Sequence, residues 1–225
     1  MHEFFATDAT QSPLQPSPLY LDLNLDFNAA DFLQEIEGVR DFLLPHRSSG
    51  APDSHRGWNQ TCLRGLEWDL TAEHKYYGFD YANEASAPLK WTIVAERCPK
   101  IVSWIQDNLP MEKFHRIRIM ELEAGGYILP HRDRFEAKLN TILLSVSYPS
   151  GCRFKLDGVG FLPLRPGMTY VIDNSRFHSI WNDSPYSRYQ IQVLGDFNAK
   201  IANIFDTALS KNFRSQGNQT KNSGM

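Results

Sequence analysis

The second half of the chain is a series of short, strand-like segments separated by turn-forming residues, and this feature constrains the fold most strongly. β-Branched and aromatic residues are frequent within the segments, and glycine, proline, asparagine and aspartate lie between them. Eight short strands with a turn every few residues are typical of a small barrel or sandwich, of which a jelly roll is one form. We predict strands at 116–122, 127–129, 140–148, 152–156, 161–164, 169–173, 178–181 and 188–194.

The first half of the chain has the apolar spacing of helices instead. Between 28 and 44 the apolar residues recur at helical spacing, with Asp31 as the expected cap and Pro45 as the stop. A second helical pattern covers 88–109, where Pro99 is expected to break or kink the helix. The fold class that follows is α+β with a mainly β core, on which N-terminal helices pack.

These elements are expected to form one domain, because 225 residues is within the usual size of a single domain. We predict a single domain at 19–209, with helices at about 28–110 and the β core at about 114–197. A last amphipathic helix is expected to end at 209. The polar ends of the chain, 1–18 and 210–225, are predicted to be a flexible arm and a disordered tail.

Composition argues against several classes of partner. The net charge is −3, with 42% hydrophobic and 22% charged residues, so neither nucleic acid nor an anionic membrane is expected to bind. No apolar run approaches the roughly 20 residues that span a bilayer. The three cysteines are far apart and support neither a zinc–thiolate site nor a disulfide framework. Partners are therefore expected to be small molecules or protein segments. With no signal-peptide pattern at the start, we predict a cytoplasmic protein.

The segment 125–133, Gly-Gly-Tyr-Ile-Leu-Pro-His-Arg-Asp, has the composition of a strand that leads into a pair of metal ligands. Its glycines permit a tight turn with positive φ, and its proline fixes the backbone just before His131. Residues two apart on an extended chain point to the same face. The imidazole of His131 and the carboxylate of Asp133 therefore project into one space, which suits two adjacent positions on an octahedral metal ion.

A third ligand is expected from another part of the barrel, and His178 is the best candidate. It begins a predicted strand after the turn at 174–176. Two histidines and one carboxylate on one face are typical of non-haem iron(II) oxygenases, in which the opposite positions stay open for cosubstrate and oxygen. We therefore predict that His131, Asp133 and His178 bind iron(II) and form the catalytic centre.

Arg188 follows His178 by ten residues and is expected to reach into the same barrel. A planar guanidinium grips a carboxylate with two hydrogen bonds, and the distal carboxylate of 2-oxoglutarate is such a target. A His-x-Asp pair alone is a weak signal. Its combination with a histidine 47 residues further on and this arginine, all within the predicted β half, is a much stronger one.

The segment from about 116 to 193 resembles the aspartyl/asparaginyl β-hydroxylase family, including its bacterial proline-hydroxylase relatives. The likeness covers roughly a third of the chain, and the helical half matches only in general character. The stretches that show it are Arg118-Ile119-Met120-Glu121-Leu122 with Pro130-His131-Arg132-Asp133, Lys138-Leu139-Asn140-Thr141-Ile142-Leu143, Leu164-Arg165-Pro166-Gly167-Met168-Thr169-Tyr170, and His178-Ser179-Ile180-Trp181-Asn182-Asp183-Ser184 followed by Arg188.

The resemblance implies a double-stranded β-helix, or jelly roll, in which oxidative decarboxylation of 2-oxoglutarate by O2 is coupled to substrate hydroxylation. Position by position, His131, Asp133 and His178 match the iron ligands of the family. Arg188 matches the arginine that binds 2-oxoglutarate. Related halogenases lose the carboxylate ligand, so Asp133 points to hydroxylation.

Four further residues are candidates for the pocket. Lys138 and Asn140 stand where the family usually has an arginine and a histidine, and they either line the cosubstrate site or face solvent. Arg118 is a candidate for binding a substrate carboxylate. Trp181, close to the last ligand, either contacts substrate or packs in the core. The segment 46–60 is predicted to be a loop that either covers the site or only connects two elements.

The function that follows is hydroxylation of an unactivated C–H bond in a free amino acid or a small derivative, with release of succinate and CO2. One alternative is a hydroxylase of aspartate or asparagine side chains in a protein or peptide. The small chain, without an appended peptide-binding repeat domain, favours the small-molecule version. An alternative of another class is a β-barrel that binds a metal or ligand without turnover.

Overall fold

The computed structural model describes residues 19–46, 53–69, 88–133 and 141–219, and structural statements below refer to these. Its helices are α1 (Ala29–Glu37), α3 (Ile93–Glu96), α4 (Pro99–Asn108) and α5 (Ala199–Gln219), with a 3-10 turn at Arg40–Phe42. Its strands are β1 (Tyr20–Asp22), β2 (Leu44–Pro45), β3 (His55–Gly65), β4 (Lys90–Trp91), β5 (Lys113–His131), β6 (Thr141–Ser145), β7 (Cys152–Leu156), β8 (Gly160–Phe161), β9 (Met168–Ile172), β10 (His178–Asn182) and β11 (Arg188–Asp196).

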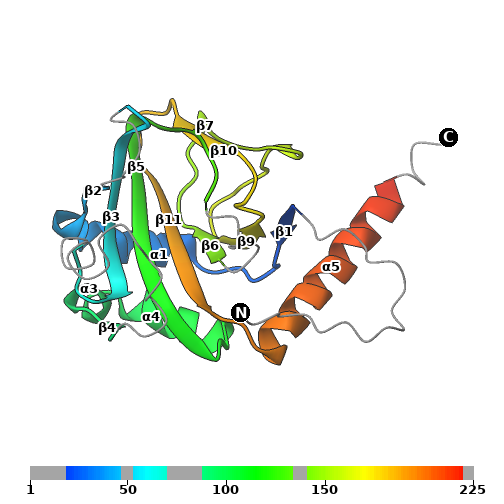
Figure 1. Ribbon diagram of the computed structural model, residues 1–225, viewed down its shortest axis with the longest axis horizontal. Coiled ribbons are helices and arrows are strands. Elements are labelled where there is room, and N and C mark those ends of the chain that lie inside the picture. The colour runs from blue at the N-terminus through cyan, green and yellow to red at the C-terminus, as the bar shows by residue number, and fades with distance from the viewer. Residues whose placement is uncertain (1–18, 47–52, 70–87, 134–140, 220–225) are drawn as a thin grey trace.

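All described strands pair antiparallel, in the order β1-β9-β6-β11-β5-β10-β7-β8, with β3 along the other side of β5. The first half of β5 pairs with β11 and its last residues pair with β10. The sheet therefore folds over itself at β5, and β7 and β10 face β6, β9 and β11 across an interior (Figure 1). This is the double-stranded β-helix that we expected.

The sharp turn of β5 depends on two glycines. Gly125 has φ 67°, a conformation that residues with a side chain rarely adopt. A Cβ atom at Gly126 would lie 2.9 Å from the carbonyl oxygens of Arg56 and Glu123. Only glycine fits this close approach between β3 and β5. The glycine pair was expected to form a turn between two strands, but it lies within one continuous strand.

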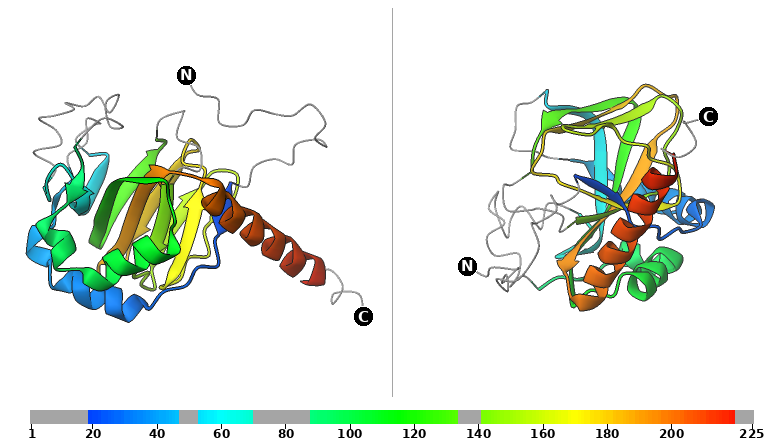
Figure 2. Two further views of the ribbon diagram at one scale, coloured as in Figure 1. Left: turned by 90° about the horizontal axis from the view of Figure 1, so that it is seen from below. Right: turned by 90° about the vertical axis from the view of Figure 1, so that its right-hand side faces the viewer.

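The helices α1, α3 and α4 cover one face of the sheet, and α5 projects from the body of the protein (Figures 1 and 2). The cap of α1 is Asn28 rather than Asp31, because the Asn28 side chain accepts hydrogen bonds from the backbone N–H groups of residues 30 and 31. The helix also ends at Glu37, earlier than its apolar pattern suggested. Pro99 breaks the second helical pattern, as expected, because α4 begins at this residue.

Two further expectations are corrected by the structure. Most of the predicted loop at 46–60 that is described belongs to β3, which begins at His55 and pairs with β5 over most of its length. The helix α5 continues to Gln219, although 210–219 was expected to be part of a disordered tail. Its first turns pack on the domain, where Ile201 and Ala208 are fully buried.

The sheet separates two apolar clusters. One lies between the sheet and the helices and contains Ile36, Ile101 and Ile191; the other fills the interior of the β-helix around Leu156 and Tyr170. Inward-facing residues of β11 are instead polar, namely Arg188, Gln190 and Gln192. Polar residues at these positions mark the interior as a site rather than a simple core.

The three cysteines are free and buried, and burial raises the pKa of the Cys98 thiol to about 12. None of the helices in the described part of the chain is long and apolar enough to cross a membrane.

Candidate metal centre and its cavity

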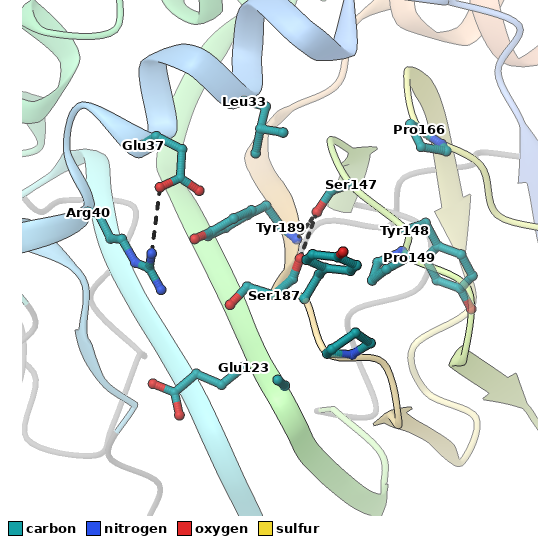
Figure 3. A pocket seen from close by; sticks show the side chains of 13 residues that line it. Leu33, Glu37, Arg40, Glu123, Ser147, Tyr148, Pro149, Pro166, Ser187 and Tyr189 are labelled. Carbon is teal, nitrogen blue, oxygen red and sulfur yellow. Dashed lines mark hydrogen bonds and ion pairs between the residues drawn. The ribbon is translucent and has the colours of Figure 1, made fainter.

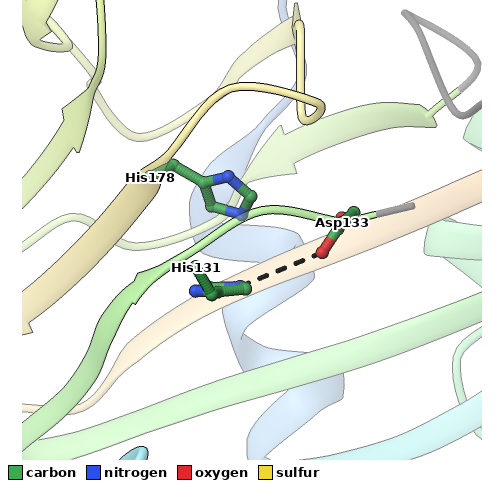
Figure 4. Close-up of side chains that lie close together, drawn as sticks. All are labelled: His131, Asp133 and His178. Atoms are coloured by element: carbon green, nitrogen blue, oxygen red, sulfur yellow. Dashed lines mark ion pairs between the residues drawn. The ribbon is translucent and has the colours of Figure 1, made fainter. Parts of the chain in front are cut away.

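The three predicted ligands lie together at one end of the β-helix (Figure 4). His131 is the last residue of β5 and His178 is the first residue of β10, and the two are directly paired in the sheet register. Asp133 follows β5 by two residues. One ligand atom from each side chain lies within 4.8 Å of the others, so the group can hold a metal ion.

Both histidines are oriented by backbone hydrogen bonds. The Nδ1 atom of His131 lies 2.9 Å from the carbonyl oxygen of Leu129, and that of His178 lies 3.0 Å from the carbonyl oxygen of Arg176. A carbonyl oxygen only accepts, so each Nδ1 is the protonated nitrogen. In the neutral form of each ring, Nε2 is therefore the nitrogen without a proton and the one available as a metal ligand.

Asp133 is held by Asn174, which the sequence predicted only as part of a turn. The Asn174 amide nitrogen donates to Oδ2 of Asp133 at 3.0 Å, and the Asp133 N–H donates to the Asn174 carbonyl oxygen at 2.9 Å. The other carboxylate oxygen, Oδ1, lies 3.9 Å from Nε2 of His131. This arrangement leaves Oδ1 directed toward the histidines as the ligand atom.

His178 is the most buried of the three side chains. Burial and the neighbouring His131 lower the pKa of His178 below the ordinary histidine value, while the Asp133 carboxylate opposes this shift. The imidazole is consequently neutral at physiological pH, which is the form that binds a metal.

A cavity of about 90 Å³ begins at the ligand group and extends into the β-helix. Its lining combines the three ligands with apolar residues and a small number of polar ones. Arg118, predicted as a substrate contact, is part of this lining, together with Gln190 and Gln192. Cavities with a few converging polar groups on apolar walls are the usual form of a small-molecule site.

Arg188 is buried behind this lining, with 3% of its surface exposed. Its guanidinium carbon is 5.8 Å from the ring centres of both Tyr148 and Phe154, and one terminal nitrogen contacts Oε1 of Gln190. The Nε atom is buried and has no acceptor among the described residues. A buried cation with an unsatisfied donor is expensive unless an anion joins it, so the donor set fits a carboxylate ligand.

Tyr170 completes the surroundings of Arg188. Its hydroxyl donates to Oε1 of Gln190 at 2.8 Å and lies 3.5 Å from a terminal nitrogen of Arg188. Burial raises the pKa of Tyr170 well above its ordinary value, so the hydroxyl stays protonated. Its single proton is donated to Gln190 and its oxygen accepts from Arg188, so the hydroxyl helps to orient the guanidinium.

The remaining predicted residues differ in their placement. Lys138 and Asn140 lie outside the described residues. Trp181 is half-buried and alternates with the inward-facing His178 and Ile180, so its side chain is on the other face of β10 and does not line the cavity. This placement does not support a contact between Trp181 and the substrate.

The sequence did not predict site roles for Gln60 and Asn174, and it left open whether Trp58, near the possible lid, contacts a ligand or packs; all three lie in or next to the cavity. Trp58 and Asn174 are part of the lining, and the Gln60 amide oxygen accepts a hydrogen bond from Arg118. Their signal was weak because Trp58 and Gln60 fall in the segment predicted to be a loop.

A second and larger cleft, of about 720 Å³, lies away from the ligands and is lined by residues of α1, β5 and β11 and the nearby connections (Figure 3). An ion pair between Glu37 and Arg40 lies in it, at 3.7 Å. None of the metal ligands lines this cleft, so the smaller cavity is the candidate site despite its size.

Comparisons with known proteins identify the family of the chain. The model of the aspartyl/asparaginyl beta-hydroxylase family matches residues 28–195, well over half of the chain, and the chain belongs to that family. The protein is thus an iron(II)- and 2-oxoglutarate-dependent oxygenase, and the predicted family and cofactors are confirmed. A search of curated proteins found no match.

Several solved structures are similar to the chain. A prolyl-4-hydroxylase from Pseudomonas putida has 14% identity and a TM-score of 0.44 over 80% of this chain and 94% of that chain. The collagen prolyl hydroxylase of Paramecium bursaria Chlorella virus-1 has 12% identity and a TM-score of 0.45 over 79% and 95%. A prolyl hydroxylase from Trichoplax adhaerens, in complex with a hypoxia inducible factor peptide, has 11% identity and a TM-score of 0.47 over 79% and 83%.

Proposed function

We propose that the protein hydroxylates an unactivated C–H bond of a free amino acid or a small amino-acid derivative, with release of succinate and CO2. The observation that supports this most strongly is the presence of two arginines inside one β-helix. Arg118 lines the cavity at the metal centre, whereas Arg188 is buried behind its lining. Two cations at different depths suit two separate carboxylates, one from the cosubstrate and one from the substrate.

The separation of the two arginines follows from the strand register. Arg188 pairs with Leu122, and Gln192, which holds Arg118, lies four residues further along β11. At about 3.3 Å per residue, that is roughly 13 Å along the strand. Arg188 is therefore proposed to bind the distal carboxylate of 2-oxoglutarate, whose keto-acid end points to the metal. Arg118 is then proposed to bind the carboxylate of the substrate.

The surroundings of Arg118 orient its guanidinium. Its Nε atom donates to the amide oxygen of Gln192 at 3.1 Å, and one terminal nitrogen donates to the amide oxygen of Gln60 at 3.0 Å. These two hydrogen bonds fix the direction of the guanidinium group. A guanidinium that is oriented in this way is suited to bidentate binding of an α-carboxylate.

Iron, when bound with 2-oxoglutarate and O2, supplies the oxidising chemistry that replaces the C–H hydrogen by a hydroxyl group. The protein's own residues would position the metal, the cosubstrate and the substrate for this reaction. His131, Asp133 and His178 would fix the coordination geometry, and Arg188 would anchor the cosubstrate. Arg118 would place the target carbon near the metal, and the apolar walls of the cavity would limit the access of water.

The first test does not require the substrate to be known. Anaerobic titration of the metal-free protein with iron(II) and then 2-oxoglutarate should produce the visible charge-transfer absorption of the chelate. We expect the band to be absent in His131→Ala and the affinity for 2-oxoglutarate to fall in Arg188→Ala. Iron binding without a band in the wild type would contradict the assignment of the cosubstrate site.

The second test addresses the substrate class. The proteinogenic amino acids and their α-amides would be screened for stimulated succinate release. We expect a free amino acid to be active, its amide to be inactive, and Arg118→Gln to raise its KM at least 10-fold, since a charged hydrogen bond is worth about 1.5–3 kcal/mol. Activity on a blocked peptide and not on any free amino acid would favour the peptide hydroxylase instead.

A further inference from the structure

A group of aromatic side chains holds Trp58 rigidly in the wall of the cavity. The imidazole of His46 stacks on the indole ring with their centres 3.6 Å apart, and the imidazole of His55 meets the same ring edge-on at 5.4 Å. The His55 Nε2 atom lies 3.0 Å from the carbonyl oxygen of His46, and the His46 N–H donates to the Trp58 carbonyl oxygen at 2.7 Å. The indole ring is therefore fixed in its direction.

The same ring has a hydrogen-bond donor that is not used. The Nε1 atom of Trp58 is buried from solvent and has no acceptor among the described residues, although the side chain lines the cavity that contains the metal ligands. Buried indole N–H groups normally have a partner, because leaving a donor unsatisfied is costly. A fixed, unsatisfied donor on a side chain that lines the cavity is open to an acceptor that arrives with the ligand.

The aromatic group is also connected to Arg118, which is proposed to bind the substrate carboxylate. The Gln60 amide nitrogen contacts Nδ1 of His46, and the amide oxygen of the same side chain accepts from Arg118 at 3.0 Å. Gln60 is 1% exposed, so this connection is protected from water. Arg118 and Trp58 are thus positioned by one continuous set of contacts on the inner side of β3.

We infer that Trp58 is a specificity-determining residue, whose indole N–H donates a hydrogen bond to an oxygen on the substrate other than the carboxylate bound by Arg118. This inference rests on the proposed function, and it narrows the substrate to amino acids with an oxygen acceptor in the side chain or on an acylated amino group. A site built to satisfy a donor discriminates against ligands that leave the donor unpaired.

Pairs of amino acids with the same shape test this discrimination. The three pairs are asparagine with leucine, threonine with valine, and glutamine with methionine. In whichever pair the wild type turns over, the first member is expected to have the higher kcat/KM. Trp58→Phe keeps the stacking ring but removes the N–H, and it should reduce that ratio about 10-fold, the effect of one neutral hydrogen bond. The KM for 2-oxoglutarate should not change. Trp104→Phe, in the cluster under the helices, is the matched control.

An equal loss of kcat/KM for both members of a pair, or an unchanged ratio, would overturn the role of Trp58. A second measurement separates this outcome from failure of the proposed function. Protein with 15N-labelled tryptophan, loaded with Zn(II) and 2-oxoglutarate so that no turnover occurs, has five indole signals, of which Trp58→Phe identifies one. Asparagine or glutamine should shift that signal, and leucine should not.

The two measurements together give distinct outcomes. A shift of the Trp58 signal without succinate release would keep the binding role of Trp58 and reject amino-acid hydroxylation. Succinate release with an unmoved Trp58 signal would keep the proposed function and reject the inference about Trp58.

Discussion

At the scale of single residues, the candidate metal centre depends on groups other than its three proposed ligands. The backbone carbonyl oxygens of Leu129 and Arg176 set the tautomers of the two histidines, and Asn174 holds one oxygen of the carboxylate. Partners of this kind fix the direction of the ligands and thereby the affinity for the ion. Backbone carbonyl groups cannot be removed by substitution, so Asn174 is where this support can be tested.

Asn174→Ala removes the hydrogen bond to Asp133 and should weaken iron(II) binding about 10- to 100-fold, because the carboxylate is then free to rotate. Anaerobic titration with a competing chelator measures the change. Asn108→Ala, at the end of α4, is the control and should bind iron as the wild type does. Unchanged affinity in Asn174→Ala would show that Asp133 needs no orientation or is not a ligand.

Arg188→Lys keeps the positive charge in the interior but loses the planar pair of donors. The affinity for 2-oxoglutarate should fall at least 10-fold, since lysine cannot form two parallel hydrogen bonds with a carboxylate. The charge-transfer band reports this directly, with iron binding as an internal check. Arg153→Lys, at an exposed ion pair with Asp183, should leave the affinity unchanged. Equal affinities in both variants would place the cosubstrate carboxylate elsewhere.

At the scale of secondary-structure elements, β5 connects the fold to the site. Its first half is part of the sheet under the helices, its last residues pair with β10, and His131 is at its end. Any change at the turn of β5 therefore shifts a metal ligand as well as the core.

Gly126→Ala tests this coupling. The new Cβ atom would lie 2.9 Å from two backbone carbonyl oxygens, so β3 and β5 must separate. We expect a loss of about 1–3 kcal/mol in the free energy of unfolding, together with weaker iron binding. Denaturant unfolding and chelator titration measure the two effects. Leu129→Ala, at an exposed position of the same strand, should change iron binding little. A destabilised Gly126→Ala that still binds iron normally would separate the turn from the site.

The elements also show which parts of the structure the sequence could predict. The strands β7, β9, β10 and β11 were predicted within a few residues because their apolar residues alternate or run continuously. β3 was missed because its segment, His-Arg-Gly-Trp-Asn-Gln-Thr-Cys-Leu-Arg-Gly, has few apolar residues and two glycines. Its inward positions are polar because Gln60 and Trp58 belong to the site. The residues of β3 that face the cavity therefore weakened the sequence pattern by which a strand is predicted.

A similar reason applies to the site residues. His131 and Asp133 could be proposed as a pair because the two-residue spacing on a strand is a local property, and His178 because it begins a predicted strand after a turn. The pairing of Arg118 with Gln60 and Gln192 was not, because it joins three strands that are far apart in the sequence. Contacts of this kind appear only when the sheet order is known.

At the scale of the whole molecule, the two faces of the sheet have different tasks. The apolar cluster under the helices stabilises the fold, while the interior of the β-helix contains two arginines. There, the buried Nε atom of Arg188 and Nε1 atom of Trp58 have no partner among the described residues. Burying such groups costs free energy that ligand binding would recover. The ligand-free protein should therefore be less stable than its complex by an amount that depends on ligand concentration.

This difference can be measured as a change in melting temperature under anaerobic conditions. Iron(II) at 100 times its Kd should stabilise the fold by about 2.7 kcal/mol, which corresponds to roughly 5–10 °C for a domain of this size. Addition of 2-oxoglutarate should raise the Tm further. Asp133→Ala should lose both increases, whereas Arg188→Lys should retain the first and lose most of the second. An iron-dependent increase that persists in Asp133→Ala would mean that the ion binds outside the His131–Asp133–His178 group, and the metal centre would have to be reassigned.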